Sequence, residues 1–204
     1  MFFANKTLFI PGCLIKAKFK KIEGNYLQIL KNLDIEFITM NDFCCGALIA
    51  EQGYEDERHA MQKESLKLLK DNKVKRIITP CPLCLNHLSS FFEAEHTSQI
   101  IFEYINHFEK KTNEQITYLE PCNLKLEEPV KILDRLGFDV IRVKDCCGFI
   151  SSFRDKITKN VLEDVKTKKL VTTCPYCYLN LKEAIDKDKA FRDIKVLELS
   201  EVLV

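Results

Sequence analysis

The sequence predicts an α/β fold built from two tandem, pseudo-symmetric halves, each containing a small parallel sheet with flanking helices. Short apolar stretches alternate with amphipathic helical stretches along the chain, which indicates parallel strands joined by right-handed helical crossovers. The chain has 204 residues, enough for two units of about 100 residues each. Its ten cysteines occur in the same order twice, which indicates an internal duplication.

The first half is expected to span residues 1–111. Apolar stretches predict strands at residues 7–10, 35–39 and 76–79, and periodic apolar positions predict helices at residues 21–33 and 56–71. A further helix is expected to start at Pro82, because proline lacks the N–H that a first helical turn leaves unpaired. Each predicted strand leads into a cysteine, so the cysteines mark the ends of strands.

The second half, residues 112–204, repeats this order in a shorter form. Strands are expected at residues 116–119, 138–143 and 170–172, and helices at residues 129–136 and 156–167. The stretches that close the halves, residues 100–105 and 196–203, are also alike, and the polar residues 106–115 are expected to link the halves. Each half is therefore interpreted as a Rossmann-like unit with its cysteines at the carboxyl-terminal edge of the strands.

The composition excludes several classes of protein. The net charge of +1 gives no overall positive charge that would attract nucleic acid. The hydrophobic content of 46% is too high for a disordered chain. The first ten residues do not have the pattern of a secretory signal, and no apolar run approaches the ~20 residues of a membrane span. We expect a cytoplasmic protein, membrane-peripheral only through a partner, in which cysteines act as metal ligands or redox thiols.

All the cysteines fall into two copies of one pattern, which is a lone cysteine, a Cys-Cys-Gly and a Cys-Pro-x-Cys. The first copy comprises Cys13, Cys44, Cys45, Cys81 and Cys84, and the second comprises Cys122, Cys146, Cys147, Cys174 and Cys177. A Cys-x-x-Cys pair can ligate one metal or cluster. The side chains of adjacent cysteines diverge, so the two seldom bind one small tetrahedral ion together. A larger metal cluster that takes soft ligands can accept both thiolates.

Several residues beside the cysteines invite more than one interpretation. Gly46 and Gly148 are expected to supply a positive φ or to let a cluster approach the backbone. His87 is expected to be a surface or capping histidine, with zinc ligation or proton transfer as the alternative. Three aromatic residues flank cysteines of the second copy and either exclude water or pack in the core, namely Phe149, Phe153 and Tyr176.

The cysteine pattern resembles the cysteine-rich, or CCG, domain that occurs twice in the B subunit of heterodisulfide reductase. The same domain occurs in related iron–sulfur subunits of glycolate, lactate, anaerobic glycerol-3-phosphate and unusual succinate or fumarate oxidoreductases. The resemblance covers essentially the whole chain. It implies that the ten cysteines are cofactor and metal ligands that hold two iron–sulfur clusters of the noncubane 4Fe-4S type.

This resemblance implies an iron–sulfur subunit of an oxidoreductase complex that reduces a disulfide, or oxidises thiols, at the clusters themselves. The sequence contains neither a Cys-x-x-Cys-x-x-Cys ferredoxin segment nor a Gly-rich dinucleotide fingerprint. We therefore expect a ferredoxin-like iron–sulfur subunit and a flavoprotein subunit as partners. A small disulfide, thiol or organic acid would be the substrate of the complex.

Two other functions stay open. The chain is alternatively an electron-transfer subunit for a flavoprotein that oxidises lactate, glycolate, glycerol-3-phosphate or succinate. It is otherwise a structural zinc protein, or a protein with zinc in one half and a cluster in the other. Because the second cysteine copy is shorter than the first, the resemblance is weaker there, and that site would hold an altered cluster or an ordinary cubane.

Overall fold

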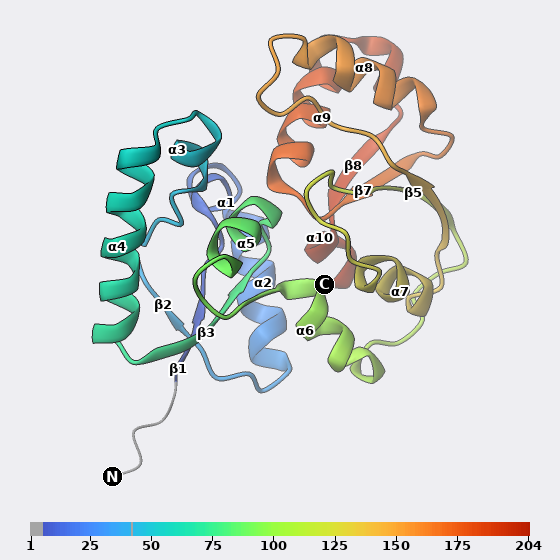
Figure 1. Cartoon of the computed structure of the whole chain (residues 1–204). Helices are drawn as coiled ribbons and strands as arrows, with labels where there is room; N and C mark the ends of the chain where they lie inside the picture. Colours follow the sequence, from blue (N-terminus) through green and yellow to red (C-terminus); the bar gives the residue numbers. More distant parts are fainter. Residues whose placement is uncertain (1–5, 42) are drawn as a thin grey trace.

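The computed structural model describes residues 6–41 and 43–204, and these residues form two four-stranded parallel sheets (Figure 1). The first sheet has the order β2-β1-β3-β4, from β1 (Lys6–Phe9), β2 (Ile38–Thr39), β3 (Val74–Thr79) and β4 (Ala94–His96). The second has the order β6-β5-β7-β8, from β5 (Gln115–Leu119), β6 (Asp139–Val143), β7 (Lys169–Thr172) and β8 (Lys195–Glu198). The predicted fold class is confirmed.

Helices connect the strands in both halves. The first half contains α1 (Cys13–Lys18), α2 (Lys20–Asn32), α3 (Ala47–Glu51), α4 (Glu55–Asp71), α5 (Pro82–Ser89) and α6 (Thr97–Glu103). The second contains α7 (Glu128–Arg135), α8 (Arg154–Asp164), α9 (Pro175–Lys187) and α10 (Leu199–Leu203). Helix α2 buries Ile22, Tyr26 and Ile29, because residues at this spacing share one helix face. Residues 1–5, part of the stretch judged not to be a secretory signal, lie outside the described residues.

The fourth strand of each sheet was not predicted from the sequence, and neither were helices α1, α3, α6, α9 and α10. Strands β4 and β8 are short, and each runs directly into a helix, so no turn residue separates the two. Strand β2 is also shorter than expected, since only residues 38 and 39 pair with β1. Short edge strands make few contacts and therefore leave a weak pattern in the sequence.

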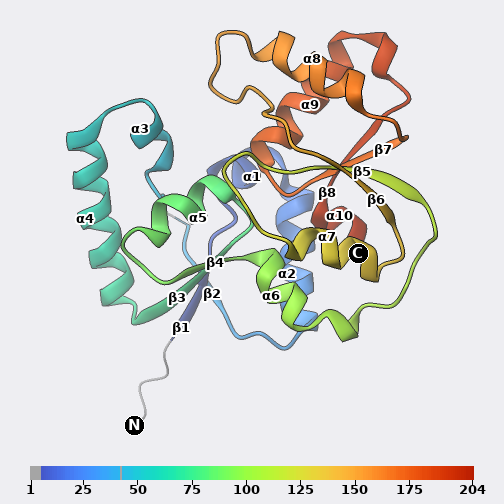
Figure 2. The ribbon, with the colours of Figure 1, turned by 45° about the vertical axis from the view of Figure 1, so that its right-hand side comes forward.

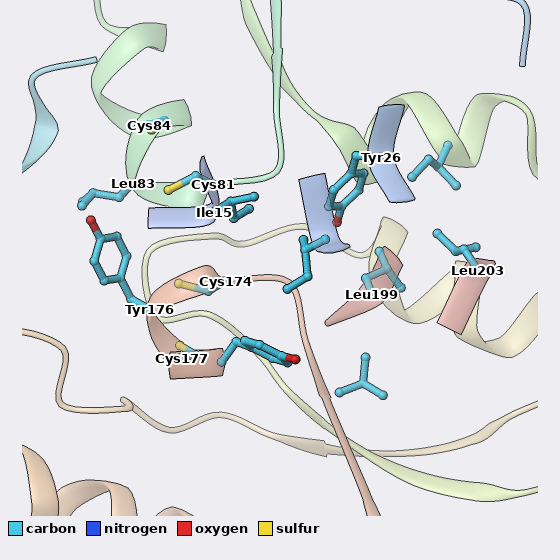
Figure 3. Packing of buried hydrophobic residues seen from close by; sticks show 14 of the residues in the cluster. Ile15, Tyr26, Cys81, Leu83, Cys84, Cys174, Tyr176, Cys177, Leu199 and Leu203 are labelled. Atoms are coloured by element: carbon cyan, nitrogen blue, oxygen red, sulfur yellow. The ribbon is translucent and has the colours of Figure 1, made fainter. Parts of the chain in front are cut away.

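The last helix of each half packs against the other half (Figure 2). Helix α6 contacts α7, and α10 contacts α2. Tyr26 and Leu199 are fully buried where α10 meets α2 (Figure 3), and the Tyr26 hydroxyl donates a 2.6 Å hydrogen bond to Glu198 Oε1. This exchange of helices joins the two halves through their hydrophobic core.

The topology places a switch point in each sheet. Strands β1 and β3 are neighbours although β2 lies between them in sequence, and β5 and β7 are related in the same way. At a switch point, the chain segments that connect the central strand to its two neighbours pass over opposite faces of the sheet. Ligands bind in the crevice that this leaves outside the carboxyl ends of the strands. Cys13 and Cys81 follow the neighbouring strands β1 and β3, so the first switch point is lined by thiols.

Gly137 closes α7 in a conformation that only glycine adopts readily. Its φ is +91°, and an added Cβ would lie 2.0 Å from the Thr112 carbonyl oxygen. We expect Gly137→Ala to destabilise the metal-free protein by about 2 kcal/mol, measured by urea unfolding. Gly24→Ala is the control, because Gly24 lies in α2 with no atom near the added Cβ, and it should stabilise by about 0.5 kcal/mol. Equal effects of the two substitutions would contradict this account.

Candidate functional site

The structure brings each set of five cysteines to the carboxyl-terminal edge of its own sheet. In the first half, Cys13 opens α1 and the pair Cys44-Cys45 lies just before α3. Cys81 is the N-cap of α5 and Cys84 lies in its first turn, with Pro82 at the helix start as predicted. Cys174 and Cys177 have the same positions at the start of α9. Helix starts therefore carry five of the ten thiols, which fixes the backbone positions of these five.

The first cysteine set surrounds a small apolar cavity. The cavity has a volume of about 30 Å³ and is lined by all five thiol-bearing residues together with Gly46, Ala47, Leu48, Ile49, Leu83 and Tyr176. The Sγ atoms of Cys45 and Cys84 are 3.0 Å apart. Soft thiol donors that converge on an apolar space are the chemistry that iron–sulfur clusters and thiophilic metals require. The described residues contain no group of three His, Cys, Asp or Glu side chains arranged to hold a single metal ion.

Glycines with a positive φ lie beside the cysteines of both sets. Gly12 has a φ of +87°, and an added Cβ would lie 3.1 Å from Cys81 Cβ and 3.6 Å from Cys84 Sγ. Gly46 has a φ of +77°, as the Cys-Cys-Gly motif predicts. Gly148 has a φ of +72° at the equivalent place in the second half. Gly12 was not singled out from the sequence, although its position next to Cys13 is the signal for it.

The second cysteine set has a more charged border. The thiols of Cys147 and Cys177 are hydrogen bonded to each other, and Cys146 Sγ accepts a 3.3 Å bond from the Gly148 amide. A pocket of about 580 Å³ lies beside Cys122 and Cys146. Its charged lining residues are Glu120, Lys125, Glu127, Arg142, Lys144 and Asp145.

Solvent exposure divides both sets in the same way. The lone cysteine and the first cysteine of the adjacent pair are exposed, namely Cys13, Cys44, Cys122 and Cys146. The second cysteine of the pair and both cysteines of the Cys-Pro-x-Cys are buried, namely Cys45, Cys81, Cys84, Cys147, Cys174 and Cys177. Each set therefore has an anchored inner side and an accessible outer side.

Neighbouring thiols shift one another's pKa values. The hydrogen bond between Cys45 and Cys84 lowers the pKa of Cys45 and, together with burial, raises that of Cys84 well above its usual range. Cys147 and Cys177 repeat this pattern. Partial desolvation at the edge of the set, followed by the charge of Cys146, raises the pKa of the solvent-accessible Cys122 to about 11. Cys45 is thus favoured over Cys84 for ionisation, and Cys147 over Cys177, and thiolates are the form that binds metal.

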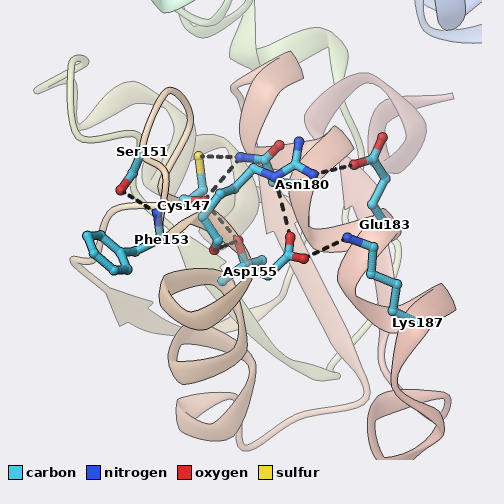
Figure 4. A network of polar contacts seen from close by, with 9 residues as sticks. Cys147, Ser151, Phe153, Asp155, Asn180, Glu183 and Lys187 are labelled. Carbon is cyan, nitrogen blue, oxygen red and sulfur yellow. Dashed lines mark hydrogen bonds and ion pairs between the residues drawn. The ribbon is translucent and has the colours of Figure 1, made fainter.

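Side chains from the helices hold the two Cys-Cys-Gly turns. In the first half, Ser65 of α4 donates a 3.2 Å hydrogen bond to the Cys44 carbonyl. In the second, the Cys147 carbonyl accepts bonds from Thr158 Oγ1 of α8 at 2.9 Å and from Asn180 Nδ2 of α9 at 3.1 Å. Asn180 Nδ2 also lies 3.7 Å from Cys147 Sγ (Figure 4). None of these three supporting residues was identified from the sequence, because they follow no motif.

The two bonds to the Cys147 carbonyl predict a non-additive response to substitution. We expect Asn180→Leu and Thr158→Val each to destabilise the metal-free protein by about 1 kcal/mol, since the other donor remains. The double variant should lose more than the sum, because it leaves a buried carbonyl without a partner. Urea unfolding of the four proteins completes the cycle, and strict additivity would show that the donors act independently.

The two halves meet beside the cysteine sets. Asn86 Nδ2 of α5 donates a 2.7 Å hydrogen bond to the Asn123 carbonyl, next to Cys122. Tyr176 flanks the second set in sequence, yet its hydroxyl lies 3.8 Å from Cys13 Sγ in the first set. Burial, followed by the charge of Cys13, raises the pKa of Tyr176, so the hydroxyl stays protonated at neutral pH. The cysteine sets are therefore connected through the interface between the halves.

The other flanking residues have varied surroundings. The Phe149 ring packs on Tyr176 with ring centroids 3.8 Å apart, whereas Phe153 is 69% exposed and does not cover a thiol from water. His87 is half-buried, and its Nε2 has no hydrogen-bond partner among the described residues. An added Cβ on Gly46 would lie 3.6 Å from this Nε2, so the histidine sits beneath the first Cys-Cys-Gly turn and not on the open surface. Burial lowers the pKa of His87.

Comparisons with known proteins agree with the pattern of the cysteines. The family model described as the cysteine-rich domain, CCG, matches residues 7–89 and 116–182, which is both halves. An uncharacterized iron–sulfur protein of Methanocaldococcus jannaschii is 21% identical over 97% of this chain and 46% of its own length. The B subunit of the fumarate reductase (CoM/CoB) of Methanothermobacter marburgensis is 24% identical over 96% of this chain and 45% of its own.

The D subunit of the dihydromethanophenazine:CoB–CoM heterodisulfide reductase of Methanosarcina acetivorans is 23% identical, over 93% of this chain and 56% of its own length. The chain thus spans about half the length of these relatives. Among solved structures, the glutamate racemase of Aquifex pyrophilus aligns over 98% of this chain and 81% of its own, with 16% identity and a TM-score of 0.43. None of the helices in residues 6–41 and 43–204 combines the length and the apolar composition that a membrane span needs.

The resemblance predicted from the cysteine pattern is confirmed, because the family model covers most of the chain and matches a Cys-Cys-Gly and a Cys-Pro-x-Cys in each of two segments. The chain belongs to the cysteine-rich CCG domain family, with distant homology to heterodisulfide reductase subunits and to iron–sulfur proteins.

Proposed function

We propose that this chain binds two iron–sulfur clusters and acts as the iron–sulfur subunit of an oxidoreductase complex. Its own reaction would be the reduction of a disulfide, or the oxidation of thiols, at these centres. One observation carries the proposal: each half gathers five thiols at the carboxyl-terminal edge of its sheet, and the two sets lie on either side of one interface. The names of the relatives support the same class of protein.

The donor set fits such a group. Cys13, Cys44, Cys45, Cys81 and Cys84 would hold the first cluster, and Cys122, Cys146, Cys147, Cys174 and Cys177 would hold the second. The thiols are soft ligands, and Gly12 leaves space where a side chain would press on Cys81 and Cys84. When bound, an iron–sulfur cluster supplies one-electron chemistry at a potential set by its type, its hydrogen bonds and its exposure.

The division into inner and outer thiols supports a reaction at the cysteine sets. Six buried thiols would anchor the groups, whereas the exposed Cys13, Cys44, Cys122 and Cys146 face the side that a substrate or partner reaches. The apolar cavity at the first set suits uncharged sulfur atoms. The pocket at the second set has three basic and three acidic side chains, and Arg142 is paired with Glu120 and Glu127, so Lys125 and Lys144 are the groups that would suit an anionic end of a small thiol or disulfide.

A second function is favoured by the name of one relative. The B subunit of a fumarate reductase shares 24% identity with this chain, so members of this family also serve complexes with an organic-acid reaction. In that case the chain would pass electrons between a flavoprotein subunit and another acceptor, without touching the substrate. Both functions need the same two centres and differ in whether a thiol reaches them.

Anaerobic purification separates these functions from a zinc protein. The proposal expects iron and acid-labile sulfide for two clusters, with EPR signals that change when small thiols are added. The probes are 2-mercaptoethanol, cysteamine and 3-mercaptopropionate, which share a thiol and differ in charge. Signals indifferent to all three, and to their disulfides, would favour electron relay. Stoichiometric zinc without labile sulfide would overturn both redox functions.

A further inference from the structure

Tyr176 is placed between the two cysteine sets. It belongs to the second Cys-Pro-x-Cys, because it follows Cys174 and Pro175 at the start of α9. Its side chain nevertheless leaves the second set and lines the cavity of the first. Figure 3 shows the ring rising from the ribbon that carries Cys174 and Cys177, with its hydroxyl directed toward Leu83 and Cys81. The contact joins residues 163 positions apart.

The hydroxyl is held where it can donate to sulfur. Tyr176 is only 8% exposed, and its ring packs against Phe149. Its Oη lies 3.8 Å from Cys13 Sγ, a long hydrogen bond to sulfur in which either atom could be the donor while Cys13 is a thiol. A hydroxyl donates and a ligating thiolate accepts, so the bond stabilises negative charge on Cys13. Hydrogen bonds to ligand sulfurs raise the reduction potential of a centre.

The equivalent positions in the first half lack this contact. Leu83 occupies the place of Tyr176 in the first Cys-Pro-x-Cys and has no polar atom to offer. His87 occupies the place of Asn180, and its Nε2 has no partner among the described residues, whereas Asn180 approaches Cys147 Sγ. Helix α9 therefore supplies one polar contact to a sulfur of each set. This makes the two sets chemically unequal despite their equal cysteine patterns.

We propose that Tyr176 is a positioning residue of the first centre, whose hydroxyl donates to the Cys13 sulfur from the opposite half and raises the reduction potential of that centre alone. The inference rests on the proposed function, since it needs a cluster at the first set. The inference also goes beyond the proposed function. It makes the segment that carries Cys174 and Cys177, ligands of the second centre, part of the surroundings of the first centre.

The test is an EPR-monitored redox titration of the full chain with Tyr176→Phe, which removes the hydroxyl and keeps the ring. We expect the one-electron reduction equilibrium of the first centre to become less favourable by about threefold to tenfold, the upper value being about 59 mV. The second centre should keep its midpoint. The Cys147→Ser background, which removes a ligand of the second centre, assigns the signal that moves.

Tyr178→Phe is the matched control on the same helix. The Tyr178 hydroxyl accepts a 2.9 Å bond from Lys182 Nζ and does not contact a cysteine among the described residues, so neither midpoint should shift. Equal iron content with no shift in Tyr176→Phe, or the same shift in Tyr178→Phe, would overturn the inference and leave the proposed function standing. A wild-type protein without iron and sulfide would overturn both.

Discussion

Replacing Cys45 with serine is expected to halve the iron and acid-labile sulfide of the anaerobically purified protein. Cys45 is buried, with its Sγ 3.0 Å from Cys84 Sγ, so a serine there puts a hard oxygen at the centre of the first set. The second set lies on the other sheet and keeps its own five thiols. Iron and sulfide analysis, with EPR of the reduced protein, measures the loss.

Cys147→Ser is the reciprocal control, because Cys147 has the same place in the second set and is buried in the same way. It should remove the other half of the iron and a different EPR signal. Ser65→Ala supplies a structural control, since Ser65 supports the first Cys-Cys-Gly turn without offering a thiol, and it should retain both centres. Loss of both centres in either cysteine variant would show that they assemble as one unit.

Glu198→Gln is expected to remove a pH dependence of stability from the metal-free protein. Glu198 is fully buried, accepts hydrogen bonds from Tyr26 and Ser200, and caps α10. Burial is the main cause that raises its pKa to about 7. Between its unfolded value and pH 7, the folded protein therefore holds a proton that the unfolded chain has released. Stability from this group is present at low pH and is lost as pH rises through 7.

The expected loss is about 2 to 3 kcal/mol between pH 5 and pH 8, and Glu198→Gln should not show it. Urea unfolding at the two pH values, with thiols kept reduced, measures the difference. The ionisable groups around Glu198 are Tyr26, Tyr178 and Glu201. Glu201→Gln is the matched control, because its side chain accepts from the Glu198 amide and its charge is only the smallest cause of the raised Glu198 pKa, so most of the pH dependence should remain. Parallel curves for wild type and Glu198→Gln would contradict the assignment.

Much of the fold was predictable because strands and cysteines follow each other in the sequence. Six strands were expected near their observed positions, and Pro82 marked the start of α5. The convergence of thiols followed from strand direction alone, since parallel strands present their carboxyl ends at one edge. The positive φ of Gly46 also followed from its motif. These features depend on local sequence or on topology.

The contacts between halves were not predictable from local patterns. Tyr176 looked like a neighbour of the second set, and only its side-chain direction places it at Cys13. Asn180 is an ordinary polar residue in α9 until the fold brings Cys147 beside it. Glu198 and His96, both buried caps of exchanged helices, likewise have no sequence signal. Such contacts join residues far apart in the chain, so periodicity and motif spacing carry no information about them.

The exchange of α6 and α10 has a consequence for how the chain acquires its structure. Asn25 and Ser200, 175 positions apart, face each other where α10 covers α2. Contacts of such sequence separation slow folding, because long loops must close before any stabilisation is gained. While the chain is being synthesised, the part of α2 that α10 covers therefore stays uncovered until residues 199–203 have been made. During that interval the thiols of the first half are accessible before their final surroundings exist.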